Sequence, residues 1–110
     1  MRSRLMTTDI TDIFKTLSNE YRWQMLQWLK APQVHFSGAE FSADALDDNG
    51  GVCVVAVTIK SGLAQSVVSG YLNALKQAGL VSARRSGKWT YYRYNAEAAA
   101  DFLARLQQQL

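Results

Sequence analysis

The sequence predicts a single, mainly α-helical domain over residues 1–110, with one small β-hairpin near its C-terminal end. Several segments repeat apolar side chains at three- and four-residue spacing, and a single proline interrupts the chain. Two short extended runs flank Ser86-Gly87, which is typical of a hairpin. Nearly half of the residues are apolar, so one core of ordinary size can form.

The composition also limits where the protein works. It holds no apolar run of the length needed to cross a membrane, and its N-terminus lacks the apolar core of a signal peptide. The single cysteine, Cys53, has no partner for an internal disulfide, which suits a reducing compartment. We therefore expect a cytoplasmic protein without membrane contact.

Two helices are predicted in the N-terminal part, after a basic arm at residues 1–6. Thr7 or Thr8 is expected to cap the first helix, with Asp9 in its first turn. Its apolar stripe consists of Ile10, Ile13, Phe14 and Leu17. The second helix, residues 19–30, has too many apolar groups for one narrow stripe, so neighbours are expected on more than one side.

Pro32 is expected to end the second helix and to open an acidic insertion, residues 31–51, which we call the acidic excursion. The segment shows no sustained helical or strand period, except for one helical turn near residues 42–46. Asp48-Asn49-Gly50-Gly51 is a strong turn signal. His35 has no second ligand at helical or turn spacing, so no metal site is predicted here.

Residues 52–61 are apolar and β-branched, which is compatible with either a strand or a helix. Gly62 follows, and then a new helix begins near Ala64. Two helices joined by a three- or four-residue turn that contains glycine form a helix-turn-helix, and this context favours a helix over residues 52–61.

The helix at residues 64–78 divides into two faces when each residue is given a rotation of about 100°. The apolar face consists of Ala64, Val67, Val68, Tyr71, Leu72, Leu75 and Ala78. The other face consists of Gln65, Ser66, Ser69, Gly70, Asn73, Lys76 and Gln77. Short hydrogen-bonding groups of this kind suit the reading of base edges, although the wheel alone favours a surface helix with a solvated polar face.

Charge is strongly segregated along the chain. Residues 60–94 contain six basic and no acidic residues, whereas residues 31–59 contain four acidic residues and no Lys or Arg. A stretch of one sign is a candidate contact surface for a polyanion, and this stretch contains the helix at 64–78. The context therefore favours nucleic acid as the partner of that helix.

The C-terminal part begins after Gly79, which is expected to stop the helix at 64–78. Strands over residues 80–85 and 88–94 form the hairpin, whose tip carries Arg84, Arg85 and Lys88. Asn95 caps a last helix over residues 96–110. Its apolar seam resembles the stripe of the first helix, and together they predict a subunit interface. The predicted interface residues are Ile10, Ile13, Phe14, Phe102, Leu103, Leu106 and Leu110.

The resulting order, α-α-α-α-β-β-α, is that of a winged helix-turn-helix. The segments IFKTLSNEYRWQMLQWLK and GLAQSVVSGYLNALKQAGLVSARRSGKWTYYRYN resemble the ArsR/SmtB family of transcriptional repressors. The resemblance implies a homodimer that binds double-stranded DNA, with helix 64–78 in the major groove and hairpin 81–94 as the wing. The implied DNA-binding residues are Gln65, Ser66, Ser69, Gly70, Asn73, Lys76, Arg84, Arg85 and Lys88.

The chain departs from the family pattern at two places. Gly70 and Tyr71 stand where a long polar residue followed by His is usual, which affects operator preference. The thiolate metal site of the family needs a second cysteine where Val55 stands, and the last helix has no His, so neither a metal nor another cofactor is expected.

Alternative functions follow from the same residues. The polar face of helix 64–78, which we call the recognition face, could dock an acidic protein instead of DNA. Alternatively, Cys53 could make the regulator responsive to thiol chemistry. An inducer of unknown chemistry is a further possible partner. An enzyme is not expected, because the sequence has no nucleophile motif, phosphate loop or acid–base pair at fixed spacing.

Overall fold

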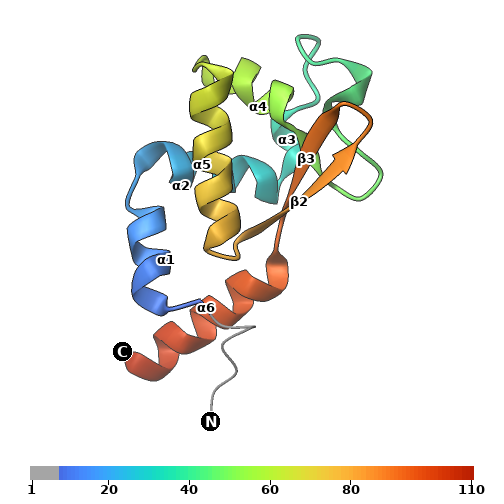
Figure 1. Cartoon of the computed structure of the whole chain (residues 1–110). Coiled ribbons are helices and arrows are strands. Elements are labelled where there is room, and N and C mark those ends of the chain that lie inside the picture. The colour runs from blue at the N-terminus through green and yellow to red at the C-terminus, as the bar shows by residue number, and fades with distance from the viewer. Residues whose placement is uncertain (1–7) are drawn as a thin grey trace.

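The computed structural model describes residues 8–110 and has the mainly helical architecture expected, with a small antiparallel β-hairpin (Figure 1). Its elements, in chain order, are α1 (Ile10–Leu17), α2 (Glu20–Lys30), α3 (Pro32–His35), the 3-10 turn η1 (Ala43–Ala45), β1 (Val52–Cys53), α4 (Val54–Ser61), α5 (Gln65–Gln77), β2 (Val81–Ser86), β3 (Trp89–Tyr94) and α6 (Ala96–Gln109). In Figure 1, α5 stands in the centre, between α1 on one side and the strands on the other, and α6 runs beneath it. No helix within residues 8–110 is both long and apolar enough to span a bilayer.

The start of α1 differs from the prediction. Asp9, and not Thr8, is the N-cap residue, because its carbonyl oxygen accepts the amides of Asp12 and Ile13 at 3.0 and 3.2 Å. Thr7 and the arm at residues 1–6 lie outside the described residues.

The second helix, α2, begins as predicted, with Asn19 Oδ1 accepting the Arg22 amide at 3.0 Å. The Arg22 side chain then turns back to the last carbonyls of α1: its Nε donates to the Thr16 oxygen at 2.7 Å and its Nη2 to the Lys15 oxygen at 3.4 Å. Carbonyls at a helix end lack partners within the helix, so Arg22 both satisfies them and fixes α1 on α2.

The acidic excursion is attached to the core. The helix α2 ends at Lys30, and Pro32 is the first residue of α3, where its missing amide hydrogen removes no hydrogen bond. Phe36 is buried and packs edge-on against Trp28 and Phe41, with centroids 6.4 and 5.3 Å apart. The turn η1 lies inside the predicted helical turn at 42–46, whereas α3 was not predicted.

The apolar run at 52–61 is a helix from Val54 onward, as predicted from its context. Its first two residues instead form β1, which pairs antiparallel with β3 through Val52↔Tyr92 and Cys53↔Tyr91. The hairpin is therefore part of a three-stranded sheet of order β1-β3-β2. A two-residue strand is too short to produce a period in the sequence, so only its pairing with β3 identifies it.

Two glycines end the two helices of the helix-turn-helix, one after α4 and one after α5. Gly62 has φ +72° and its amide donates to the Thr58 oxygen at 3.1 Å, which ends α4. Gly79 has φ +80° after α5, and the Leu80 amide donates to the Leu75 oxygen at 3.1 Å. Between them α5 buries Val68, Leu72 and Leu75 completely.

The last helix, α6, is fixed mainly by its N-terminus. Asn95 Oδ1 accepts the Ala98 amide at 3.2 Å, and its Nδ2 donates to the Gly79 oxygen at 3.0 Å, so one side chain joins the end of α5 to the start of α6. Farther along, the Phe102 ring meets the Phe14 ring edge-on at 5.6 Å, and Arg105 Nη1 donates to the Thr8 oxygen at 2.7 Å.

The double role of Asn95 leads to a stability prediction. Asn95→Ala should lower the free energy of unfolding by about 1–3 kcal/mol, because it removes both the cap and the bond to Gly79. Asn95→Asp keeps the capping oxygen and loses the amide donor, so its unfolding free energy should fall between those of wild type and Asn95→Ala. Urea denaturation measures both, and an unchanged midpoint in Asn95→Ala would refute the role.

Candidate nucleic-acid interface

The solvent-facing side of α5 carries the residues that the sequence predicts to contact DNA. Most of them are exposed: Gln65, Ser66, Gly70, Asn73 and Lys76, with Ser69 half-buried among them. The rotation of the helix about its axis is fixed by the buried Val68, Leu72 and Leu75, so these groups are held outward. The structure thus brings six predicted residues together on one helix face.

The first turn of α5 offers backbone donors as well as side chains. Its N-cap residue, Ala64, supplies no side-chain cap, and no acidic residue occurs in the turn. The first amides that bond within the helix are those of Val67 and Val68, to the Ala64 oxygen. The amides of Gln65 and Ser66 precede them and can donate to a phosphate, as amides at helix N-termini commonly do.

Val67 was predicted to lie on the buried face, and this was wrong: the side chain is 43% exposed. It sits in the first turn, next to the exposed Gln65 and Ser66, whereas its neighbour Val68 is fully buried. An apolar side chain in this position can contact the methyl group of thymine, a contact that a count of polar residues overlooks.

The sheet is tied to α5 by a tyrosine. The Tyr92 hydroxyl donates to Asn73 Oδ1 at 3.4 Å, a long bond that joins β3 to the outer face of the helix. Burial raises the pKa of Tyr92, so its hydroxyl keeps its proton and remains a donor at neutral pH. Sequence reasoning missed this role, and the alternation of aromatic residues along β3 was its only signal.

The two wing arginines lie on opposite faces of the hairpin. Arg84 pairs with Tyr91 and Arg85 pairs with Thr90, and residues directly opposite in a sheet share a face. Tyr92 lies on the same face as Thr90, two residues along β3, so Arg85 is on the side of α5. Arg84 is on the side of the acidic excursion.

The excursion supplies negative charge on that second side. The Tyr91 hydroxyl donates to the Asp44 carbonyl oxygen at 2.9 Å, and Arg84 lines a small cavity together with Asp47 and Arg93. Burial, with smaller effects from Cys53, Asp44 and Asp47, raises the pKa of Tyr91. Arg84 therefore lines the same small cavity as an acidic residue, whereas the described residues on the Arg85 face of β2 and β3 include no acidic one.

The tip of the wing is basic and exposed. Gly87 has φ +60° in the turn, and Arg85 Nε donates to its carbonyl oxygen at 3.2 Å. Lys88 extends beside Trp89, with its Nζ 5.4 Å from the ring centroid. A cation on an aromatic ring at the surface keeps its charge available to a phosphate.

Two residues of the acid-free stretch have internal roles. Lys60 Nζ lies 5.4 Å from the Trp28 ring and 5.9 Å from the Phe36 ring, so it joins α4 to the excursion. Tyr71 stacks on Tyr21 with centroids 5.7 Å apart and an interplanar angle of 13°, and the Arg22 guanidinium lies over the same ring. Tyr71 therefore packs α5 against α2 and is not a solvent-facing side chain that could contact a base.

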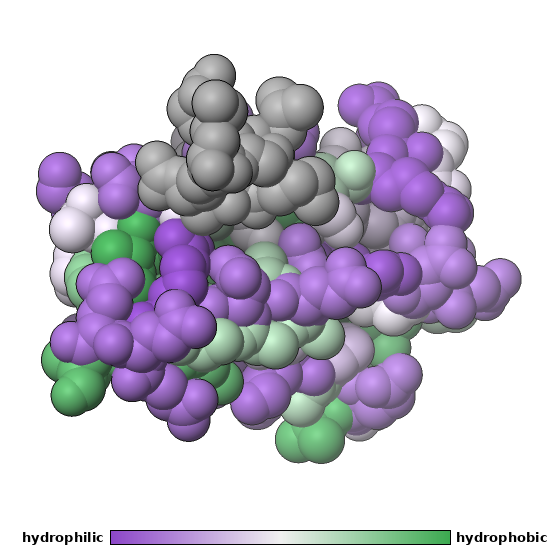
Figure 2. Space-filling model, turned by 90° about the horizontal axis from the view of Figure 1, so that it is seen from below, coloured by the Kyte–Doolittle hydropathy of each residue, from purple (hydrophilic) through white to green (hydrophobic). Residues whose placement is uncertain are grey.

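The predicted interface residues do not all lie at the surface. Ile13 is 2% exposed and belongs to the core of its own chain. Its side chain therefore has almost no surface left with which to contact a second subunit. Phe14, Leu103 and Leu110 are exposed, and Ile10, Phe102 and Leu106 are half-buried. Figure 2, viewed from the side along which α6 runs, shows apolar residues between polar ones on this face.

Cys53 is only 4% exposed, in the edge strand β1 of the sheet, so reagents have little access to its thiol. Within residues 8–110, no three His, Cys, Asp or Glu side chains are grouped so as to hold a metal ion. The low exposure of Cys53 gives no support to the thiol-responsive alternative.

Comparison with known proteins places this arrangement among regulators. The chain is 49% identical over 96 residues to the uncharacterised HTH-type transcriptional regulator YbzH of Bacillus subtilis, covering 84% of this chain and 92% of that protein. A Halobacterium salinarum protein that carries the name arsenical resistance operon repressor ArsR2 is 33% identical over 90 residues, or 82% of this chain and 61% of that protein. The chain belongs to the ArsR-type helix-turn-helix transcriptional regulators.

A solved structure supports the same conclusion for the fold. A homodimeric winged helix-turn-helix DNA-binding domain from Mycobacterium bovis is 28% identical, with a TM-score of 0.57 over 91% of this chain and 78% of that one. No protein-family model matches the sequence. As an ArsR-type regulator the protein binds DNA, and α4 and α5 are the two helices of its helix-turn-helix.

Gly70 is the most unusual residue of the recognition face in this ArsR-type regulator. It lies in the interior of α5, and nothing lies within 4 Å of the position that a Cβ atom would occupy. Gly70→Ala should therefore raise the free energy of unfolding by about 0.5–1 kcal/mol, because alanine loses less backbone entropy in a helix.

The same substitution should weaken DNA binding, because its methyl group stands between the helix and the groove. Thermal unfolding and fluorescence anisotropy with operator DNA measure the two effects separately. A destabilised variant would show hidden crowding at this position, and unchanged DNA affinity would place Gly70 away from the groove.

Proposed function

We propose that the protein acts as a homodimeric repressor that places α5 of each subunit in the major groove and its wing, residues 81–94, on the flanking backbone. One observation carries this proposal. The outward face of α5 and the Arg85 face of the wing meet at the hydrogen bond from the Tyr92 hydroxyl to Asn73, and both faces lack acidic residues. Such a surface suits a strand of phosphates with base edges between them.

The groups on α5 match what the major groove requires. An α-helix fits this groove, where glutamine and asparagine can pair with adenine and serine with several bases. Gln65 and Ser66 combine such side chains with unbonded first-turn amides, so this end of the helix can contact a base and a phosphate together. Lys76, near the other end, would meet the backbone.

The dimer rests on the outer helices. The helix α6 buries no residue fully within its own chain, and Leu103 is 59% exposed on it. The ring of Phe14 in α1 packs against the ring of Phe102 in α6, and Phe14 is still 46% exposed to solvent. A second copy would cover these side chains, and the related Mycobacterium bovis domain is homodimeric.

Repression and location extend the proposal further. The relative from Halobacterium salinarum carries the name of an operon repressor, and we extend that mode of action to this chain. A regulator works in the compartment that holds the DNA, which agrees with the cytoplasmic location expected from the sequence. An inducer that releases the DNA is part of the same proposal.

Selection of genomic fragments on the immobilised protein at moderate salt should enrich a discrete site with two related half-sites. On that site, Arg85→Ala should weaken binding and lower the slope of log K against log salt by about one. Arg84→Ala should cost less, because Asp47 already lies near that arginine. Fluorescence anisotropy across a salt series measures all three proteins.

Lys15→Ala provides the matched control, since this exposed lysine lies on α1, away from the proposed surface. It should leave both affinity and salt slope unchanged. The repressor hypothesis fails if no discrete site is enriched, and the division of roles between the two arginines fails if Arg84→Ala costs as much as Arg85→Ala.

The dimer is tested on α6. Leu103→Glu should shift sedimentation toward monomer, because it places a charge in the apolar seam of the interface. Ala104→Glu introduces the same charge about 100° round the helix from Leu103, outside the apolar seam, and should stay dimeric. Monomers in both variants, or dimers in both, would move the interface elsewhere.

A further inference from the structure

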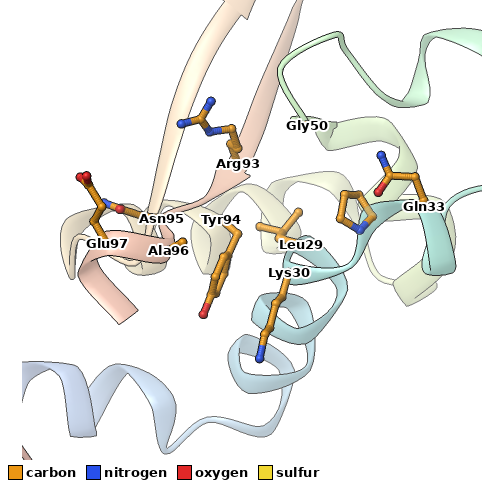
Figure 3. Close-up of a pocket in the computed structure, with 10 residues that line it drawn as sticks. Leu29, Lys30, Gln33, Gly50, Arg93, Tyr94, Asn95, Ala96 and Glu97 are labelled. Carbon is orange, nitrogen blue, oxygen red and sulfur yellow. The ribbon is translucent and has the colours of Figure 1, made fainter. Parts of the chain in front are cut away.

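An open cavity of about 530 Å³ lies between the end of α2, the last strand of the wing and the start of α6 (Figure 3). Its floor includes Leu29, which is almost fully buried, and Pro32. Its volume is within the range of pockets that bind small molecules, on the order of 300–1,000 Å³. None of the predicted DNA-contacting side chains of α5 or of the wing tip lines it.

The rim of this cavity carries more positive than negative charge. Figure 3 shows the Arg93 side chain extending to one side of Leu29, while Lys30 and Tyr94 extend to the other. Glu97 lies at one end as the one acidic lining residue. Arg93 uses one donor on the Asn49 oxygen, at 3.4 Å, out of the five that a guanidinium has.

We propose that this cavity binds a small organic anion, whose apolar body rests on Leu29 and Pro32 and whose charged group pairs with Lys30 or Arg93, and that its binding weakens the hold on DNA. The second part rests on the proposed function. Carboxylate and phosphate groups share the required chemistry, since both accept hydrogen bonds from these two cations.

The position of the cavity supplies the connection to DNA. Tyr94 ends β3, Asn95 caps α6 and Ala96 begins it, so the wing passes directly into the proposed dimer helix at the wall of the cavity. An occupant therefore contacts the wing and α6 together.

The first test measures binding without DNA. Benzoate and phenyl phosphate serve as probes, and benzamide is their neutral counterpart. Titration followed by backbone amide NMR should shift the signals of Gln33, Gly50 and Ala96, which line the cavity, for both anions and not for benzamide. Equal shifts with benzamide, or no shifts at millimolar anion, would overturn the proposal.

The second test identifies the cation. Lys30→Met should weaken benzoate binding by about fivefold or more, the effect of one nearby charge at a surface. Lys15→Met removes the same charge from α1 and should leave binding unchanged. Thermal unfolding of each variant checks that the fold is intact, and Arg93→Met gives a second reading at the opposite rim. Undiminished benzoate binding in both Lys30→Met and Arg93→Met would refute the assignment.

The third test adds operator DNA. Saturating benzoate should lower the DNA affinity of the wild type by about fivefold or more, a usual size for coupling between sites. Lys30→Met should keep the DNA affinity of the ligand-free protein and lose the response to benzoate. If the anions bind and DNA affinity stays constant, the regulatory part of the proposal is wrong; if the ligand-free protein selects no operator, the proposed function fails while anion binding still stands.

Discussion

The burial of one face of α5 is the interaction on which the remaining arrangement depends. Val68, Leu72 and Leu75 are completely removed from solvent, and burial of each such side chain stabilises a fold by roughly 1.5–3 kcal/mol. Three anchors at positions four and three residues apart allow one rotation of the helix about its axis. That rotation decides which side chains face outward, so the same packing that stabilises the core also defines the surface offered to DNA.

Tyrosines then connect the other parts to this helix. Tyr71 packs α5 against α2 through its stack on Tyr21, Tyr92 reaches Asn73 from β3, and Tyr91 reaches the excursion at Asp44. A tyrosine can do this because its ring fills apolar space while its hydroxyl still finds a partner at the edge. The wing is therefore held on both of its faces, which limits how far it can tilt relative to α5.

Local sequence patterns were sufficient to predict the elements whose own residues show a helical or strand period or a turn signal. The spacing of Leu72 and Leu75, the glycine at 79 and the hairpin around Ser86-Gly87 predicted α5 and the wing with small errors at the ends. Features that depend on contacts far along the chain were missed. Val52 and Cys53 form a strand only because β3 lies beside them.

The same distinction explains the errors in the candidate site. A helical wheel assigns Val67 and Val68 to the same apolar face, with Val67 at its edge, but the neighbouring elements cover only Val68. Ile13 has the spacing of an interface residue, yet its own core already encloses it. The roles of Tyr91 and Tyr92 arise from partners 47 and 19 residues away, which no local pattern contains.

The sheet separates the acidic excursion from the face that contains α5. Because alternate residues of β3 face opposite sides, Tyr92 looks toward α5 while Tyr91 and Arg93 look toward the excursion. The carboxylate of Asp47 is thus near Arg84 and on the far side of the wing from Arg85. A net charge of +3 understates the potential at the α5 face, since much of the acidic charge lies behind the sheet. The excursion therefore favours one orientation of the protein toward a polyanion, with the excursion turned away from it.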